Sequence, residues 1–378
     1  MSSYSLKNLV AGNEAFSGRF EDKEDTSISI EVENEIVEEM EEQEEVVETI
    51  NDNDDTTEAV DEMIATFEYA ERMAEVVTQC GWSKPVAMIF NHGQFNGALG
   101  EVEEVFNITL PANESLEMIA SPYDTNSIAV MEGFKDTMKK FWEWIKKGAK
   151  RIWEGIKNLG SKILAFFVSV ERTSKRLATA LKDVNSIDPE KAKDKKFKIM
   201  KRKVFVGLIG VIDKILVYGF KFAKRDYVEE DKNFDVLGFS VSKDGSVKFN
   251  DKNSTIKDIV DASKEESFSG NTISLWTLDD VKDNKLIVSL IRNGHRIEQT
   301  INEMKKLSNK LESDANKYSK MYSNDADAKA AKDARDEAKK DMKYITGAQK
   351  IITKCIKDSV YLAKHFIKVQ RAFLACKA

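Results

Sequence analysis

The sequence has few of the residues that define several classes of protein. Three cysteines among 378 residues exclude a disulfide-stabilised scaffold and are typical of a reducing compartment. Four prolines exclude collagen-like and proline-rich chains. Residues 1–10 contain one lysine and no apolar run long enough for the core of a signal peptide. We therefore expect an ordinary folded protein with ample chain for a hydrophobic core.

Long apolar runs are also scarce. The longest candidate, residues 204–220, only reaches the lower limit of about 17–25 residues for a membrane span. It contains Asp213 and Lys214, each of which costs roughly 2.5–3.5 kcal/mol near the bilayer centre. We therefore expect this segment to lie inside a soluble fold.

Charge is divided very unevenly along the chain. Residues 1–132 contain 31 acidic and 5 basic side chains, whereas residues 133–378 contain 34 acidic and 53 basic ones. The two parts therefore carry formal charges of −26 and +19, although the whole chain carries only −7. The acidic part is a possible intramolecular counter-charge for the basic part, which has the composition of a polyanion-binding body.

The acidic part contains two regions. Residues 1–60 form an acidic leader, in which ten of the eighteen residues 31–48 are Glu, so we expect disorder or a marginal helix there. Residues 61–132 complete the acidic part. Apolar spacing predicts a helix over residues 62–77, and residues 81–131 are expected to be irregular, with a short strand at 86–90.

The basic part begins with a long amphipathic helix. Apolar residues from Phe134 to Val170 recur at spacings of three and four, which predicts a helix about 55 Å long if it is unbroken. Gly148, Gly155 and Gly160 are candidate kinks, because each costs about 1 kcal/mol relative to Ala in a helix. A second helix is predicted over residues 195–225, after a lysine-rich opening.

Further along, the pattern changes from helical to alternating and back. Residues 236–249 alternate around Asp244-Gly245, which predicts a β-hairpin, and residues 272–276 are a candidate strand. Helical spacing returns at residue 278; residues 324–343 are expected to form an exposed helix, and apolar residues recur at helical spacing over residues 345–373. The predicted fold class is mainly α: an acidic, partly disordered leader, then a helical body with a small β-hairpin insertion. The basic part comprises amphipathic helices (133–230), the hairpin insertion (231–277) and a C-terminal helical region (278–378).

Catalytic and metal-binding patterns are missing. No phosphate-binding G-x-x-x-x-G-K-[ST] loop is present, and Cys80 and His92 have no second pair of ligands at zinc-site spacing. Cys355 falls on an apolar stripe and is predicted to be a buried core residue, while His295 and His365 are predicted to be structural or solvated. We therefore predict no enzymatic activity, no cofactor and no metal.

The Lys- and Trp-rich helix is the candidate contact surface. Cations interleaved with aromatic residues bind DNA phosphates without sequence preference, and the same composition is typical of helices that lie on membranes. The simpler interpretation is a core-facing stripe with a solvated basic face. The candidate DNA- or membrane-contact residues are Lys139, Lys140, Trp142, Lys146, Lys147, Lys150, Arg151 and Trp153.

An acidic leader followed by a basic helical body that opens with Phe141-Trp-Glu-Trp-Ile-Lys-Lys resembles the internal head (prohead core) proteins of large tailed bacteriophages. The resemblance concerns the layout of most of the chain. It implies a structural protein inside the virion head, made in the host cytoplasm and assembled with capsid or core proteins. It also implies that a phage maturation protease removes the acidic propeptide and leaves a body associated with packaged double-stranded DNA.

In that class the protease cuts after Glu in short motifs with a small or aliphatic residue two positions earlier. The matching motifs in the acidic part end at Glu14, Glu31, Glu114 and Glu117, with a looser match at Glu132; Glu171 and Glu265 also match inside the body. Position favours Glu117 or Glu132 as the cleavage site. A cut after Glu117 leaves a body of charge +17, and a cut after Glu132 leaves +19.

Two alternatives to this virion function remain open. One is a membrane-active effector that inserts residues 134–170 into a membrane surface once the leader has left. The other is an assembly adaptor whose acidic arm binds a basic partner.

Overall fold

We analysed a computed structural model of the chain, which describes residues 28–92, 119–226, 239–241, 247–249, 259, 262–318 and 328–378. The chain divides into two units, Met1–Glu44 and Glu45–Ala378. The first unit contains the beginning of helix α2 (Ile28–Cys80), and the rest of this helix belongs to the second unit. The leader is therefore helical from Ile28 onward.

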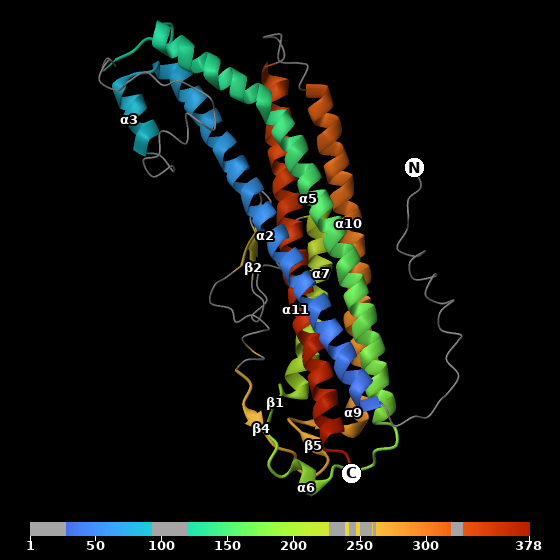
Figure 1. Cartoon of the computed structure of the whole chain (residues 1–378). Helices are drawn as coiled ribbons and strands as arrows, with labels where there is room; N and C mark the ends of the chain where they lie inside the picture. The colour runs from blue at the N-terminus through green and yellow to red at the C-terminus, as the bar shows by residue number, and fades with distance from the viewer. Residues whose placement is uncertain are drawn as a thin grey trace. The chain divides into compact units, whose positions relative to one another are not determined.

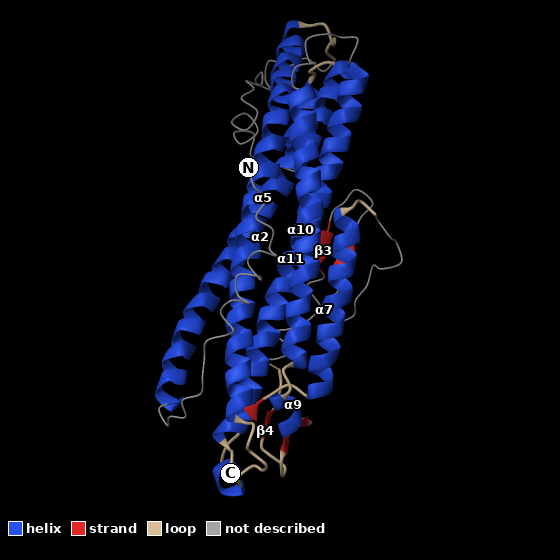
Figure 2. Ribbon diagram, turned by 90° about the vertical axis from the view of Figure 1, so that its right-hand side faces the viewer, coloured by secondary structure: helices blue, strands red, loops and turns tan. Residues whose placement is uncertain are grey.

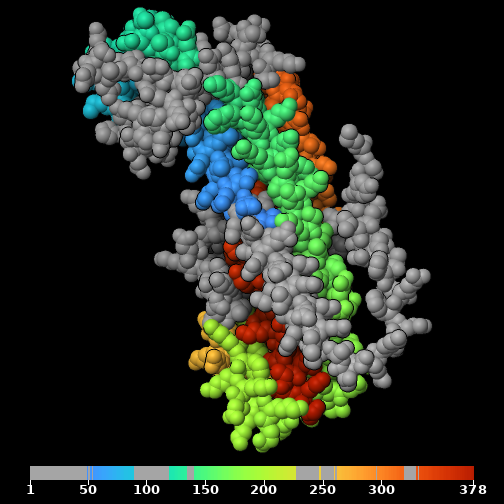
Figure 3. Space-filling view, viewed as in Figure 1, coloured from blue at the N-terminus to red at the C-terminus, as the bar shows by residue number. Residues whose placement is uncertain are grey.

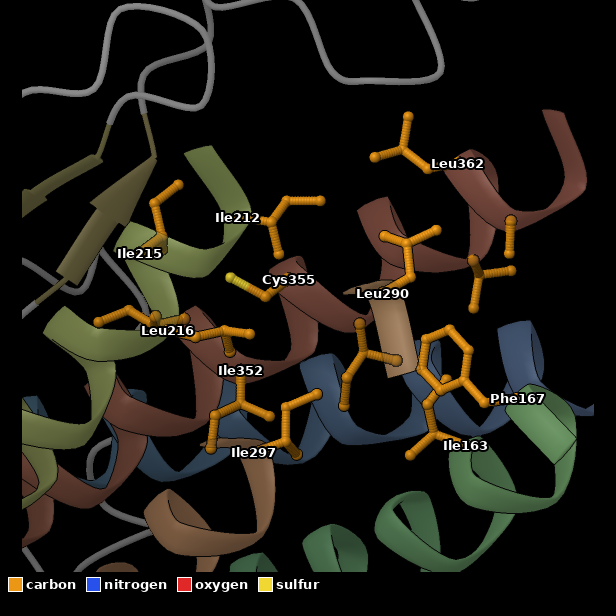
Figure 4. Close-up of a cluster of buried hydrophobic side chains, with 14 of the residues drawn as sticks. Ile163, Phe167, Ile212, Ile215, Leu216, Leu290, Ile297, Ile352, Cys355 and Leu362 are labelled. Carbon is orange, nitrogen blue, oxygen red and sulfur yellow. The ribbon is translucent and has the colours of Figure 1, made fainter. Parts of the chain in front are cut away.

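Four helices form the core of the second unit: α5 (Thr125–Ala180), α7 (Arg202–Ala223), α10 (Lys285–Tyr318) and α11 (Ala328–Ala375). They run side by side, and α11 contacts the other three (Figures 1 and 2). Figure 4 shows side chains from all four helices meeting in this core, among them Phe167 of α5, Ile212 of α7, Leu290 of α10 and Cys355 of α11. The predicted mainly helical body is confirmed, as is the buried position of Cys355.

Helix α5 includes the whole predicted stripe and begins earlier than the stripe does. Asp124 caps its first turn by accepting a hydrogen bond from the Ser127 backbone N–H at 2.7 Å. The helix continues through its glycines. A Cβ on Gly148 would lie 3.3 Å from the Met63 side chain of α2, so glycine at this position allows two helices to approach closely.

Helix α7 begins later than predicted. The lysine-rich segment before it contains the short helix α6 (Pro189–Ala192) and the strand β1 (Phe197–Lys198), which pairs with β4 (Glu265–Glu266). Tertiary hydrogen bonds keep this segment from being helical. The Met200 N–H donates to His365 Nε2 at 2.9 Å, and the Met200 carbonyl accepts from Trp276 Nε1 at 2.8 Å.

The small β elements follow. Strands β2 (Phe239–Val241) and β3 (Val247–Phe249) pair antiparallel, which confirms the predicted hairpin, although its turn lies outside the described residues. The strand predicted over residues 272–276 is instead a tight pair, β5 (Thr272–Ile273) and β6 (Trp276–Thr277). Ser274 and Leu275 between them both have positive φ angles, 49° and 67°. Helix α9 (Leu278–Lys282) follows directly, capped by Thr277.

One further prediction was wrong, and another holds only in part. Residues 84–92 form a helix, α3 (Lys84–His92), and not a strand; Val86 and Ala87 are buried with Trp82. The part of α11 that was predicted to be exposed is exposed at its start, as at Lys332 and Asp336. Further along, neighbouring helices cover it and bury Ala338, Lys339, Asp341 and Met342, and α11 continues without interruption to Ala375.

Two separate hydrophobic clusters hold the second unit together. The main cluster joins Val60, Ile64 and Phe67 of α2 to α5, α7, α10 and α11. The satellite cluster joins the last turns of α2 to α3 and to the start of α5; its buried members are Ala70, Met73, Val77, Trp82, Val86, Ala87 and Val130. Helix α2 thus passes from one cluster to the other.

Within the described residues, no helix is both long and apolar enough to cross a membrane.

Candidate nucleic-acid interface

The basic face of α5 points to solvent because the apolar stripe on its other side is buried. Phe141, Ile145 and Ile152 lie in the main core, and the cations on the opposite face of the helix are exposed. The exposed cations among the candidate contact residues are Lys140, Lys146, Lys147, Lys150 and Arg151. Lys139 also lies on α5, but its side chain is outside the described set.

The two candidate tryptophans contact the protein itself. Trp142 is only 1% exposed and stacks on Tyr318 of α10, with ring centroids 5.6 Å apart. Its assignment as a surface contact residue is therefore corrected: Trp142 lies on the apolar stripe and is a core residue. Trp153 is half-buried, and the Lys305 ammonium lies 5.3 Å from its ring centroid.

Several cations on α5 already have partners within the chain. Lys146 Nζ lies 3.7 Å from Glu312 Oε1 and donates to Asn316 Oδ1 at 3.2 Å, and Lys150 lies 3.8 Å from Glu154. These pairs are exposed, so each is worth well under about 1 kcal/mol and exchanges readily with other anions. Lys140, Lys147 and Arg151 complete the solvent-facing basic surface of α5.

A second basic surface lies at one end of the helices and was not among the predicted contact residues. Residues 191–203 contain eight Lys or Arg and one Asp. Figure 3 shows this part of the chain, in lime, against the C-terminal end of α11, in red. Lys191 and Lys195 donate to the carbonyls of Lys377 and Ala375 at 3.0 and 2.9 Å, as cations do at helix C-termini. The exposed lysines around them are Lys193, Lys196, Lys201 and Lys203. The density of lysine in the sequence is the signal that points to this surface.

A ladder of ion pairs joins the acidic face of α2 to the basic face of α11. Glu75 pairs with Lys332, and Asp61 pairs with Lys350. Between these two rungs, Glu71 accepts from Arg335 at 2.7 Å and also pairs with Lys339. Glu68 accepts from Lys343 at 2.8 Å. The order of the rungs shows that the two helices are antiparallel.

The ladder is partly shielded from water. Arg335 and Lys339 are 11% and 9% exposed, and their shared partner Glu71 is 15% exposed. At the outer rung, the hydrogen bond from Lys332 to Glu75 raises the pKa of the Lys332 ammonium, which therefore stays charged.

A separate group of charges lies between α7, α10 and α11. Asp341 has no exposed side-chain surface and lies between Arg225, at 2.8 Å, and Lys310, at 2.6 Å. Glu337 joins both cations, and the Arg225 hydrogen bond holds the pKa of the Glu337 carboxyl below its ordinary value. Each of the two cations pairs with both carboxylates, so this cluster fixes the packing of three helices.

His365 and Cys355 are buried on α11. Burial lowers the pKa of His365 to about 4, so its Nε2 is a neutral acceptor for Met200 at physiological pH. Burial raises the pKa of the Cys355 thiol well above its ordinary value, which suppresses the nucleophilic thiolate. Among the residues that the structure describes, no three His, Cys, Asp or Glu side chains form a group suited to a metal ion.

The candidate cleavage positions fall in different settings. Glu117, Glu114 and Glu14 lie outside the described residues. Glu31 is in the part of α2 that belongs to the first unit. Glu132 is exposed but lies inside helix α5, between the fully buried Val130 and the half-buried Gly133. Because proteases nick exposed, unstructured backbone far more readily than helices, this position argues against Glu132.

Comparison with known proteins gives one family. A family model described as phiKZ-like phage internal head proteins matches residues 31–219, half of the chain. No curated protein and no solved structure matches the chain. The matched residues include the acidic face of α2, the basic face of α5 and most of α7, and they end before α10 and α11.

Proposed function

The chain belongs to the family of phiKZ-like phage internal head proteins, and on that premise we propose that it is a non-enzymatic precursor whose basic body binds packaged double-stranded DNA. Its acidic N-terminal part is the propeptide, removed by the phage maturation protease after the body has assembled with capsid or core proteins inside the head.

The observation that carries this proposal is the division of charge between the two parts of the chain. Residues 133–378 have a formal charge of +19, and their cations gather on the exposed face of α5 and around residues 191–203. A surface of that kind neutralises phosphates and releases counterions, with no need for base-specific contacts. The body contains no recognition-helix or zinc-finger motif, so we expect binding that ignores DNA sequence.

Of the two favoured cleavage positions, Glu117 suits the proposal better than Glu132. A cut after Glu117 leaves the capped start of α5 intact, whereas a cut after Glu132 removes its first two turns together with the buried Val130. The Glu117 cut also fits the motif, with Ser115 two positions earlier.

The membrane alternative requires the apolar stripe of α5 to leave the core, where Phe141, Ile145 and Ile152 are buried. The adaptor alternative differs from the virion proposal in needing no processing. We therefore use processing and DNA binding as the two tests.

The first test is the mass and N-terminal sequence of the protein recovered from phage particles. The expected N-terminus is Met118. An N-terminus at Gly133 would still support removal of a propeptide but would place the cut after Glu132. An intact N-terminus at Met1 or Ser2 would overturn the processing part of the proposal.

The second test is binding of the full chain to a short DNA duplex of random sequence between about 50 and 200 mM salt. Replacing Lys140, Lys147 and Arg151 by Gln should weaken binding equally for all sequences and reduce the slope of log K against log salt by up to about 3. An affinity that does not change with salt would overturn DNA binding through phosphates.

A further inference from the structure

The rungs of the ladder at Glu68, Glu71 and Glu75 differ from the rung at Asp61 in the hydrophobic cluster to which the neighbouring side chains of α2 belong. From Val60 to Phe67, α2 buries apolar side chains against the main core. Beyond Phe67, its buried side chains, such as Met73 and Val77, belong to the satellite cluster with α3 and the start of α5. The contact between Glu68, Glu71 and Glu75 of α2 and α11 is therefore a polar seam between two hydrophobic clusters.

The α11 side of this seam consists of four cations: Lys332, Arg335, Lys339 and Lys343. Their spacing of three and four residues places them on one face of the helix. A shallow polar hollow opens at the upper rungs, lined by Glu68, Glu71, Arg72, Glu75, Lys332, Asp336 and Lys339, so solvent reaches the pairs. Opening the seam separates charges but exposes little apolar surface from α2, so salt and competing anions favour it.

We infer that this face of α11 is a masked phosphate-binding surface for double-stranded DNA, and that Glu68, Glu71 and Glu75 of α2 occupy the positions of the DNA phosphate oxygens. The inference rests on the proposed function, in which the body binds packaged DNA, and adds a regulated surface to it. Four cations along one helix face suit an extended polyanion better than a single small anion. Their partners on α2 belong to the acidic part of the chain, whose covalent link to the body the proposed processing cuts; Lys339 also pairs with Asp336 of α11 at 2.8 Å.

The test compares two triple variants of the full chain with the same change in net charge. The seam variant carries Glu68→Gln, Glu71→Gln and Glu75→Gln. The matched control carries Asp55→Asn, Glu58→Gln and Glu62→Gln, which neutralise exposed carboxylates on the same helix away from the seam. Binding to a random-sequence duplex is measured between about 50 and 200 mM salt.

The seam variant should bind DNA at least about tenfold more tightly than the control at the lower salt, with a log–log salt slope steeper by about 3, because the four cations lose their carboxylate partners on α2 while Lys339 keeps Asp336. Adding Lys332→Gln, Arg335→Gln, Lys339→Gln and Lys343→Gln to the seam variant should return the affinity to the control value. Equal affinities for the seam variant and the control would show that only net charge matters, and would overturn the inference.

Hydrogen exchange on the unaltered chain gives an independent measurement if the seam variant folds poorly. Adding DNA should accelerate exchange in α2 beyond Glu68 and slow it in α11 around Lys332–Lys343; unchanged exchange in both would overturn the inference.

Failure of the proposed function gives a different result, since then neither the unaltered chain nor the variants bind DNA. If replacing Lys140, Lys147 and Arg151 by Gln weakens DNA binding while the seam variant matches its control, the proposed function stands and the masked surface does not.

Discussion

Arg335 Nε lies 2.7 Å from Glu71 Oε1, and the two residues are 264 positions apart in the chain. The pair links the acidic part of the sequence to the basic part inside one folded unit. Glu71 also pairs with Lys339, so one carboxylate contacts two cations that are largely removed from water, and Asp336 contacts only Lys339. This arrangement makes Glu71 the most sensitive rung of the ladder.

Replacing Glu71 by Gln should lower the free energy of unfolding by about 2 kcal/mol, because it removes the carboxylate that two poorly solvated cations share. The measurement is chemical denaturation followed by circular dichroism. Glu75→Gln is the matched control: its pair with Lys332 is about half exposed, so the cost should be below about 0.5 kcal/mol. Equal losses for the two variants would show that burial of the Glu71 cluster adds nothing.

Two glycines of α7 give opposite predictions. A Cβ on Gly219 would lie 2.9 Å from Ile351 Cγ2 of α11, whereas a Cβ on Gly210 would meet nothing within 4 Å. Gly219→Ala should therefore destabilise the protein by about 1–3 kcal/mol through overpacking. Gly210→Ala should stabilise it by up to about 1 kcal/mol, because alanine is the better helix former. Thermal unfolding of both variants checks the pair, and a stabilising Gly219→Ala would contradict the close packing of α7 on α11.

Stability should depend on pH through His365. Its pKa is about 4 in the folded protein because burial, with Lys368 nearby, disfavours the charged form, and it is about 6.5 in the unfolded chain. As the pH falls from 7 to 5, the unfolded chain therefore takes up the proton first. Stability that is fully present above pH 6.5 should fall by about 2 kcal/mol by pH 5.

The control for this prediction is His365→Gln, which removes the titrating ring and keeps a side chain able to accept from the Met200 N–H. Denaturation at pH 7 and pH 5 should show the loss in the unaltered protein and a smaller loss in the variant. The same pH dependence in both would assign the effect to other groups.

Much of the helical fold was predictable because the apolar spacing is local. The stripe from Phe134 to Val170 predicted α5, and that stripe also determined the position of Trp142. Trp142 was placed among the contact residues because lysines lie near it in the sequence. It is instead buried on the apolar stripe, together with Phe141 and Ile145. The exposed cations, such as Lys147 and Arg151, were identified correctly as the solvated face of this helix.

The structural features that the sequence did not predict depend on contacts between residues far apart in the chain. The extended segment before α7 is held by Trp276 and His365, and neither leaves a signal near Met200 in the sequence. The short apolar run at residues 86–90 is equally compatible with a strand or a helix, and contact with Trp82 and Val130 selects the helix α3. The ladder pairs residues such as Asp61 and Lys350, which are 289 positions apart, so no local charge pattern reveals it.

When the chain is cut after Glu117, α2 should stay bound to the body. Cleavage there breaks the covalent link to the body, but it leaves Val60, Ile64 and Phe67 in the main core and the ladder in place. Phe67 packs edge-on against Phe141 and Trp144, with both pairs of ring centroids 5.1 Å apart. We therefore expect the two fragments of the cut chain to co-elute in size-exclusion chromatography at about 0.1 M salt, where charges are screened beyond about 10 Å.

Phe67→Ala removes the largest apolar contact of α2, a change that costs about 3–5 kcal/mol at a buried site. The cut variant should therefore separate into two peaks as the salt approaches about 1 M, where screening reaches about 3 Å and the ladder no longer compensates. The cut chain with Phe67 intact is the control and should remain together at the same salt. Separation of the unaltered fragments at low salt would show that cleavage alone releases the acidic part; co-elution would mean that a second event, such as competition by DNA at the seam, has to follow the cut.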